Sequence, residues 1–560
     1  MFHRRFGSIN HQEQIWAELF PCEHERWLPL ETATKIMRPT QIFRIWVAAL
    51  VLHTAAGAQA VGPWYVATNG VDSNDGTSWA VPYLTISNAL TNASTGGDTI
   101  WVSNGVYTLT ATVSNPAAKK FNIRAWSTNP ANTVLLGPGS NNVPSQSFRG
   151  VWMSGTGSLQ AFTVTNFYYT NEDYGGGVYC SAGLISNCII AGNIMGYNAS
   201  GADGITANGG GVYLAGGGVI ENCDIIGNSV YPGNWCCGGG GVFMNNNDRI
   251  RNCRIVGNRM TGSSGGSGVF GNYPGPLIII QDSVIASNSG GSRYAAGIQL
   301  VGGIISNCHV FANSNSTVGG IGFSPISTYK FGARIERCVI NNNYGTYYHG
   351  GCYIDNGITN VLISQCVIVS NYCDKQANGG LGVEKTVANV RIQNCLVAYN
   401  KGNMNWGQSG LGGAGLYVFA TNALIENCTI VSNSLVNAGA AQGAGLWATN
   451  GVRVVNSIIY HNSGVTTSNI YAFADCTFSN SCVAPLPAAG TANTDANPQL
   501  VAKDTGNFRL NNNSPCLNTG MNYEWMTGAV DLDGRKRIRY GIVDMGAYER
   551  IHSGTTYGFR

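Results

Sequence analysis

The chain has 560 residues, of which 44% are hydrophobic and 11% are charged, and its formal net charge is +3. This hydrophobic content excludes a wholly disordered protein, and the nearly neutral charge argues against a nucleic-acid partner. Its 76 glycines follow no collagen period.

The N-terminal region carries a targeting signal. Residues 37–60, MRPTQIFRIWVAALVLHTAAGAQA, have a basic start, an apolar centre and an Ala-Gln-Ala end, which is typical of a secretory signal peptide. We interpret residues 1–36 as a misassigned or extended leader. Arg44 and His53 interrupt the apolar centre, so we expect no membrane span in the mature chain. The expected location is extracellular or on a bacterial cell surface, with the periplasm as an alternative.

Residues 61–170 are expected to form an N-terminal cap and the first coils of a repeat. Within them, PYLTISNALTNA places Tyr83, Ile86 and Leu90 on one side of a short helix. This helix is predicted to cover the first coil.

Residues 171–465 hold ten copies of one unit, among them LISNCIIAGN at 184 and LIENCTIVSN at 424, spaced 25 to 35 residues apart. A glycine-led half such as GGGVY precedes each copy. The units are short, rich in Ile and Val, and broken by Gly, Asn and Ser, which predicts strands rather than helices. A period of this length indicates a β-solenoid.

Alternation within the unit places its second, fifth and seventh positions inside the solenoid. The fifth position is usually cysteine, and stacked thiols point the same way, which suits a disulfide poorly. We therefore expect a structural column of buried free thiols, while Cys476 and Cys482 outside it remain candidates for a bridge. The asparagine at the tenth position is expected to brace successive coils. The thiol column comprises Cys188, Cys223, Cys253, Cys308, Cys338, Cys366, Cys395 and Cys428.

Residues 466–550 are expected to contain the final coils and a module that covers the other end of the solenoid, followed by a tail at 551–560. The DLDG turn in this module places Asp531 and Asp533 close together. The pair is either a calcium site or a plain turn; otherwise we expect no cofactor.

Three quoted features carry a family resemblance. The repeat resembles that of the right-handed parallel β-helices of the pectate-lyase-like superfamily, and its GG-plus-Asn form is similar to the repeats of polymorphic outer membrane proteins. WYVATNGVDSNDGTSW from residue 64 looks like the usual opening of such β-helices. NPQLVAKDTGNFRL with VDLDGRKRIRYGIVDMGAYE, within 497–549, looks like the closing module of bacterial choice-of-anchor Q surface proteins.

The resemblance implies an all-β fold, a right-handed parallel β-helix with three-strand coils, a short N-terminal capping helix and a C-terminal capping module. Enzymes on this scaffold are mostly polysaccharide lyases and glycosidases. Glycoside hydrolysis requires two facing carboxyl groups, and we expect no Asp or Glu in one outward column of consecutive glycine-led strands. The catalytic candidates are instead Lys375 as a base, with His349 or Arg293 as helper, and Asp374 beside Lys375.

Aromatic residues suggest two ligand surfaces. Loops near these candidates contain Tyr294, Tyr347, Tyr348, Tyr372 and Trp406, which either stack on sugar rings or cover the coil wall. The second stripe follows the glycines and is either a structural ladder or a ligand surface; it comprises Tyr179, Tyr213, Phe243, Phe270, Tyr353, Tyr417 and Trp447.

Three functional hypotheses follow. The first is a non-catalytic, adhesin-like scaffold that contacts a polysaccharide or surface glycan. The second is a polysaccharide lyase or glycoside hydrolase, and the third is a purely structural envelope protein. The sequence leaves the oligomeric state open.

Overall fold

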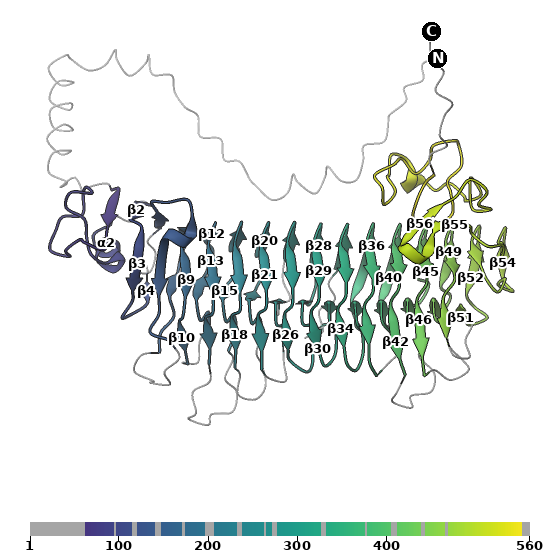
Figure 1. The fold of residues 1–560 in the computed structure, drawn as a ribbon, viewed down its shortest axis with the longest axis horizontal. Helices are drawn as coiled ribbons and strands as arrows, with labels where there is room; N and C mark the ends of the chain where they lie inside the picture. Colours follow the sequence, from purple (N-terminus) through teal and green to yellow (C-terminus); the bar gives the residue numbers. More distant parts are fainter. Residues whose placement is uncertain are drawn as a thin grey trace, which may run out of the picture. The chain divides into compact units, whose positions relative to one another are not determined.

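The computed structural model describes residues 62–93, 97–114, 120–139, 147–170, 174–196, 207–231, 238–261, 265–271, 277–325, 332–375, 378–404, 412–437, 443–464 and 469–550. In this part of the chain, strands of successive coils lie side by side in a long row (Figure 1). The expected signal peptide at 37–60, the leader at 1–36, the tail at 551–560 and Trp406 lie outside the described residues.

One coil contains four strands, as in β15 (Val212–Leu214), β16 (Val219–Glu221), β17 (Asp224–Ile226) and β18 (Ser229–Val230). The sequence predicted three strands per coil. The fourth is a two-residue strand after the asparagine, too short to show an alternation of apolar and polar residues.

Equivalent strands of successive coils pair in parallel and form four sheets. Sheet A has 16 strands from β1 (Trp64–Val66) to β54 (Gly490–Thr491), and sheet B has 14 from β3 (Gly105–Thr108) to β53 (Cys482–Val483). Sheet C, formed by the glycine-led strands, has 13 from β4 (Val113–Ser114) to β51 (Ile470–Ala472). Sheet D has 11 from β10 (Tyr168–Tyr169) to β50 (Ser463–Gly464).

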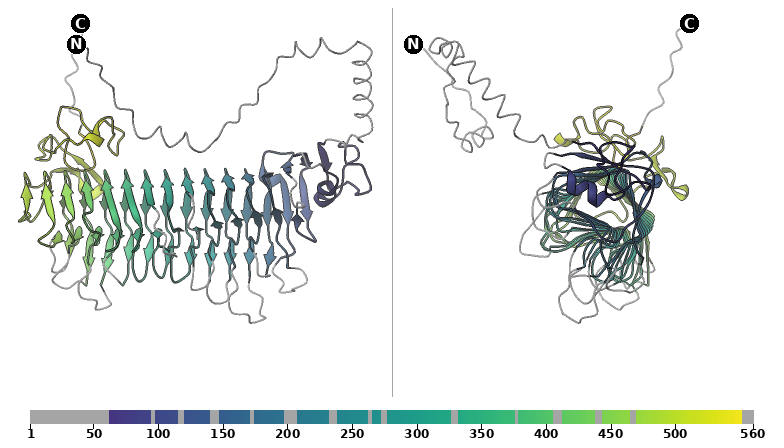
Figure 2. Two further views of the ribbon diagram at one scale, coloured as in Figure 1. Left: turned by 180° about the vertical axis from the view of Figure 1, so that it is seen from behind. Right: turned by 90° about the vertical axis from the view of Figure 1, so that its left-hand side faces the viewer.

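The chain is therefore an all-β parallel solenoid, as predicted, and its arrangement is consistent with a right-handed parallel β-helix. Figure 2 shows the coils end-on around one core. Ile185, Cys188 and Ile190 occupy the second, fifth and seventh positions of one unit and are all buried. The predicted interior positions are thus confirmed.

The cysteine column is also confirmed, because its eight thiols are buried and free. Cys476 and Cys482 are free as well, so they do not form the bridge that the sequence left open. Cys482 instead packs in a small apolar cluster with Cys516. A hydrogen bond with the Cys516 thiol, followed by burial, raises the pKa of Cys482.

A ladder of buried asparagines ties the coils together. The backbone N–H and the side-chain Nδ2 of each asparagine both donate to Oδ1 of the asparagine in the next coil, as in Asn288 to Asn313 at 3.0 and 2.9 Å. Each Nδ2 also donates to a backbone carbonyl of the preceding coil, such as Asn313 to Ile285 at 3.0 Å. The ladder contains Asn193, Asn228, Asn258, Asn288, Asn313, Asn343, Asn371, Asn400, Asn433 and Asn462.

The ladder explains why a glycine stands directly before each glycine-led strand. A Cβ added to Gly297 would lie 2.5 Å from the Gly320 carbonyl oxygen and 3.1 Å from Nδ2 of Asn313. Gly211 is equally close to Asn228, and Gly415 to Asn433. Only glycine leaves room for the asparagine behind it, so the two halves of the repeat depend on each other.

The predicted helix is present as α2 (Ile86–Asn92). Thr85 caps it by accepting a hydrogen bond from the Asn88 N–H. Tyr83, Ile86 and Leu90 are buried and belong to the main core cluster. None of the helices in the described part of the chain has the length and apolar character that crossing a bilayer requires.

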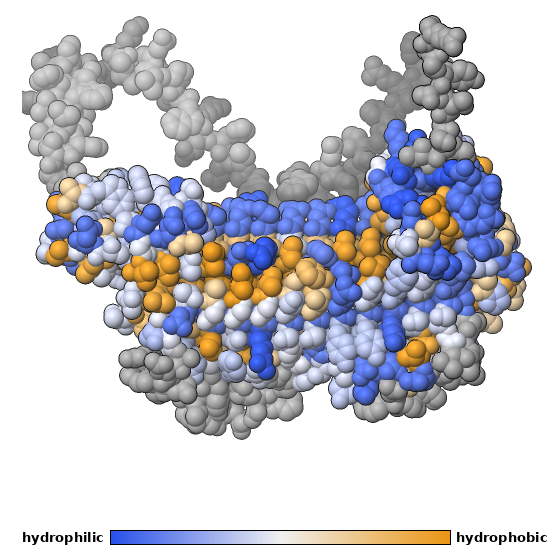
Figure 3. All heavy atoms as spheres, viewed as in Figure 1, coloured by the Kyte–Doolittle hydropathy of each residue, from blue (hydrophilic) through white to orange (hydrophobic). Residues whose placement is uncertain are grey.

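The sequence led us to expect that the closing segment, residues 497–549, lies over the end of the solenoid. The structure places it elsewhere. It contains β55 (Leu500–Ala502) and β56 (Asn507–Leu510), which pair antiparallel, and it packs on the side wall. Its Phe508, Leu510 and Met545 contact outward residues of sheet B, including Leu396 and Ile458. Figure 3 shows the apolar band along the coils that ends against this segment.

Polar residues at the corner between sheets A and B hold the closing segment in place. These corner residues have positive φ and hydrogen-bond to its backbone; Asn394 donates to the Val530 carbonyl at 2.8 Å, and Asn456 accepts from the Met521 N–H at 2.7 Å. Gln365, Asn427 and Asn480 bind it similarly. Contacts spread over five coils explain the lateral position, which no local sequence pattern encodes.

The ladder predicts a large cost for Asn313→Ala. The substitution leaves the two buried donors of Asn288 without an acceptor, so the free energy of unfolding should fall by about 3 kcal/mol. Urea denaturation followed by circular dichroism measures this. Asn132→Ala, at an exposed position, is the control and should leave the midpoint nearly unchanged. Equal midpoints for the two variants would contradict the role of the ladder.

Candidate functional site

The outward residues of sheet C form a stacked column. Tyr179, Tyr213 and Phe243 stack with ring centroids 5.5 and 4.9 Å apart, and Tyr417 stacks on Trp447 at 4.9 Å. Tyr213, Phe243, Tyr417 and Trp447 are at most 8% exposed. The sequence left open whether this column is a structural ladder or a ligand surface. The burial of these rings agrees with a structural ladder.

The column is interrupted in its middle, where a cavity opens. Between Phe270 and Tyr353 the outward positions hold Gln299 on β27 (Ile298–Leu300) and Gly322 on β31 (Ile321–Phe323). A Cβ on Gly322 would lie 2.3 Å from Oε1 of Gln299. The Gln299 side chain therefore fills the space over Gly322, and Gln299 lines the cavity.

The cavity has a volume of about 420 Å³ and a mixed polar and aromatic lining. Arg293, Tyr294 and Tyr348 come from the loops before the glycine-led strands, whereas Tyr353 and Asp355 come from β35 (Cys352–Ile354) and its end. The guanidinium of Arg293 lies 5.9 Å from the Tyr294 ring centroid. Three rings, one cation and one carboxylate thus face a common space.

A pair of carboxylates lies beside this cavity. Asp355 and Glu384 directly follow Ile354 and Val383, which are register partners on β35 and β39 (Leu381–Val383), and the Glu384 N–H donates to the Ile354 carbonyl at 3.0 Å. The two residues thus occupy one outward column, about 4.8 Å apart along the solenoid axis. The expectation concerned the glycine-led strands themselves, and this pair lies one residue past the ends of β35 and β39.

The sequence alone did not reveal this pair of acids, because each acid lies just beyond the end of its strand. Each acid follows the last buried residue of its strand and stands two positions after the aromatic column. One-residue differences between the loops hide the alignment of the two acids in the sequence. The register of β35 and β39 reveals it.

The two carboxyl groups have different surroundings. Burial, followed by the charge of Asp355, raises the pKa of Glu384. Asp355 accepts hydrogen bonds from the Tyr353 hydroxyl at 2.9 Å and from the Asn356 N–H at 2.7 Å.

Tyr417 adds a buried hydroxyl near Glu384. Its side chain on β43 (Leu416–Val418) is 1% exposed, and its hydroxyl has no hydrogen-bond partner among the described residues. Burial and the charge of Glu384 both raise the pKa of Tyr417. An unpaired buried hydroxyl is costly, which makes Tyr417 a candidate hydrogen-bonding group at this position.

His349 is buried within the column rather than facing the cavity. Its ring stacks on Tyr353 at 4.2 Å and occupies the space over Gly382, where a Cβ would approach within 2.1 Å. Burial lowers the pKa of His349 to about 3. The ring is therefore neutral at physiological pH and positions Tyr353 by packing.

The remaining candidates form a separate cluster. The Tyr372 hydroxyl donates to Asp374 at 2.9 Å, and Lys375 lies 3.5 Å from Asp374. Tyr347 is 37% exposed and does not line the cavity. The structure thus brings Arg293, Tyr294 and Tyr348 together, and leaves Lys375 and its neighbours apart from them.

Asp531 and Asp533 are engaged within the closing segment. Asp531 accepts hydrogen bonds from the N–H groups of Asp533, Arg535 and Glu549, and Asp533 forms ion pairs with Arg509 and Arg535. In the described ranges, no group of three or more His, Cys, Asp or Glu side chains is placed to hold a metal ion. These contacts describe a braced turn.

Comparison with known proteins yields structural likenesses alone. No protein-family profile matches the sequence, and no curated protein is similar to it. Pectate lyase Pel9A matches at 15% identity over 88% of this chain and 98% of its own, with a TM-score of 0.31. The Agl-KA catalytic domain matches at 15% identity over 70% and 64% (TM-score 0.37), and pectin methylesterase PemA from Erwinia chrysanthemi at 12% over 54% and 89% (TM-score 0.26).

The solved structures that this chain resembles include a pectate lyase and a pectin methylesterase. Their identities and TM-scores are too low to support any statement about activity.

The buried His349 predicts a pH-dependent stability. The unfolded ring, with its ordinary pKa of 6.5, binds a proton that the folded ring, with a pKa of about 3, does not. The free energy of unfolding should therefore fall as the pH drops below about 6.5, by up to about 1.4 kcal/mol per pH unit. Urea midpoints measured across this range should fall less steeply in His349→Phe. Parallel pH profiles would contradict the burial of a neutral ring.

Proposed function

We propose that the protein is a carbohydrate-binding β-helix that holds a glycan in the cavity over Gly322. The observation that carries this proposal is the combination of Tyr294, Tyr348 and Tyr353 with Arg293 and Asp355 around one cavity. Aromatic faces stack on the C–H faces of pyranose rings, while a guanidinium and a carboxylate bind hydroxyl groups. The rigid coils beneath hold these groups in fixed positions.

We further propose that the protein acts outside the cytoplasm, as a secreted or surface-associated molecule. The signal-like segment at 37–60 supports this location. A polysaccharide of the surroundings is then the partner.

A second candidate function is glycoside hydrolysis, which the pair of Asp355 and Glu384 favours. Glu384, with its raised pKa, would protonate the glycosidic oxygen, and Asp355 would act as the second carboxyl group. The two acids lie on neighbouring coils of one outward column, and retaining glycosidases place their two carboxyl groups about 5 to 5.5 Å apart. Tyr353 would hold Asp355 in position through their hydrogen bond.

The binding proposal predicts that Tyr348→Ala weakens glycan binding. The ring is 45% exposed at the cavity, so its loss should raise Kd about tenfold without unfolding the protein. Isothermal titration with soluble pectin, xylan and dextran measures this. Tyr347→Ala is the matched control, since its ring is similarly exposed outside the cavity lining. An equal loss in both variants would contradict a role for the cavity.

The hydrolysis candidate predicts that Glu384→Gln and Asp355→Asn each abolish shortening of the bound polysaccharide, because both roles require a carboxyl group. Size-exclusion chromatography of the polymer measures this. Glu336→Gln, on sheet A, removes a carboxylate elsewhere and should have no effect. Intact polymer with the unmodified protein would exclude hydrolysis and leave the binding function.

A further inference from the structure

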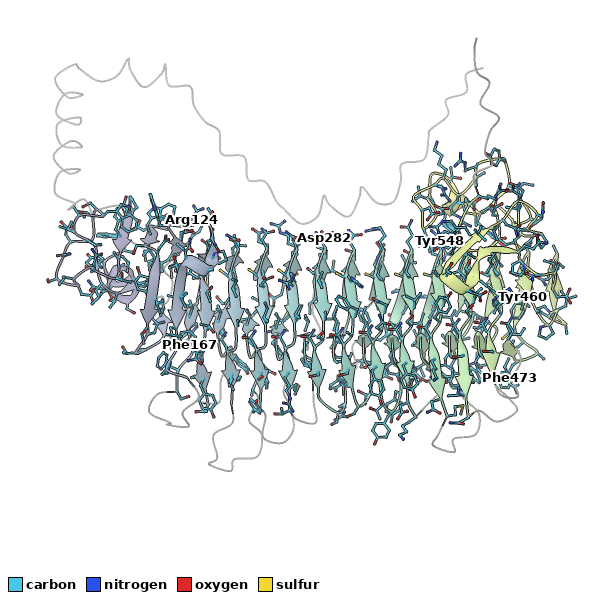
Figure 4. The ribbon with its side chains drawn as sticks, viewed as in Figure 1. Arg124, Phe167, Asp282, Tyr460, Phe473 and Tyr548 are labelled. Atoms are coloured by element: carbon cyan, nitrogen blue, oxygen red, sulfur yellow. The ribbon has the colours of Figure 1, made fainter. Side chains whose placement is uncertain are left out.

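A second aromatic surface lies at the N-terminal end of the solenoid, far from the cavity. It consists of Tyr65 on β1, Trp101 on β2 (Thr99–Val102), Trp126 after β5 (Asn122–Ala125), and Trp79 from the loop before α2. We call these four residues, together with Arg124, the N-terminal platform. Figure 4 labels Arg124 on the outer side of the first coils.

The platform rings are exposed yet fixed in place. Trp126 is 57% exposed and Trp79 is 37% exposed. Tyr65 contacts Trp79 at 4.7 Å, Trp79 contacts Trp126 at 5.2 Å, and Trp126 contacts Trp101 at 5.5 Å between ring centroids, each edge-to-face. The guanidinium of Arg124 lies 5.2 Å from the centroid of Trp101. Large indoles held rigidly at the surface lose little conformational entropy when they bind a ligand.

The platform is not part of a repeating ladder. Tyr65, Trp101 and Arg124 begin the outward column of sheet A, and from Gln160 to Glu426 every later residue of that column is polar or charged. Stacking between coils therefore does not require aromatics here. Aromatic residues stand in this column in the first coils and not between Gln160 and Glu426, which indicates a local role for them.

We propose that the N-terminal platform is a glycan-binding site separate from the cavity over Gly322. Its flat, amphipathic indoles suit pyranose rings, and Arg124 supplies the hydrogen-bond donors for hydroxyl groups. Four partly covered rings offer roughly 500 Å², less than the roughly 800 Å² that each partner of a stable protein complex buries. The size favours a sugar chain over a folded protein.

The two sites lie on different sheets and many residues apart. The strands β5 and β28 (Gly303–Ser306) are six coil steps apart in sheet A, which corresponds to about 29 Å. Substitutions at the platform and at the cavity can therefore be read independently.

Affinity electrophoresis of the full chain in gels containing pectin, alginate, xylan, dextran or chondroitin sulfate tests the platform. At least one polysaccharide should retard the protein, and Trp126→Ala and Trp79→Ala should each weaken this retardation about tenfold. Trp152→Ala is the matched control, because this indole is 41% exposed on β7 (Val151–Met153) in sheet C. It should leave the retardation unchanged.

The outcomes separate the platform from the cavity. Retardation that Tyr348→Ala abolishes and Trp126→Ala leaves intact would overturn the platform and keep the proposed function. The reverse pattern would support the platform and count against the cavity. The platform proposal would also be contradicted if no polysaccharide retards the protein. It would be contradicted too if the two platform variants bind phosphatidylglycerol vesicles more weakly but bind every polysaccharide as before.

Discussion

The asparagine ladder is the interaction on which the rest of the structure depends. Each amide satisfies one backbone N–H and one backbone carbonyl at a bend and joins its neighbours at 2.8 to 3.0 Å between Asn193 and Asn433. The ladder is buried, so these hydrogen bonds compete with no solvent, and a break would leave polar groups unsatisfied. It fixes the register between coils, and register decides which outward residues become neighbours.

A fixed interior allows the exterior to vary. Gly322 and Gln299 replace aromatic residues in the column of sheet C beside the cavity without disturbing Ile298 or Ile321, which stay buried beneath. The same register places Asp355 beside Glu384, and it places the Trp101 ring next to Arg124 at the N-terminal end. Sites on this scaffold are therefore local departures from a repeated pattern over a few coils, and they inherit the rigidity of the ladder.

The contrast between the repeated interior and the variable exterior explains which features could be predicted from the sequence. The interior positions of Ile185, Cys188 and Asn193 recur in ten units, so their roles were readable as columns. The carboxylate pair occurs once, beyond the ends of its strands, and appears only when β35 and β39 are placed in register. The lateral position of the closing segment depends on Asn394, Asn456 and other corner residues that lie up to 165 positions from their partners. No local pattern reports such contacts. Of the predicted loop tyrosines, Tyr294 and Tyr348 line the cavity, whereas Tyr347 and Tyr372 do not.

The central claim is that a glycan occupies the cavity over Gly322, and a crystal structure of the protein soaked with oligosaccharides of the polymer that it binds tests this most directly. The account predicts a pyranose ring against Tyr348 and Tyr353, with hydroxyl groups bonded to Arg293 and Asp355. A sugar bound elsewhere, with the cavity unchanged, would contradict it.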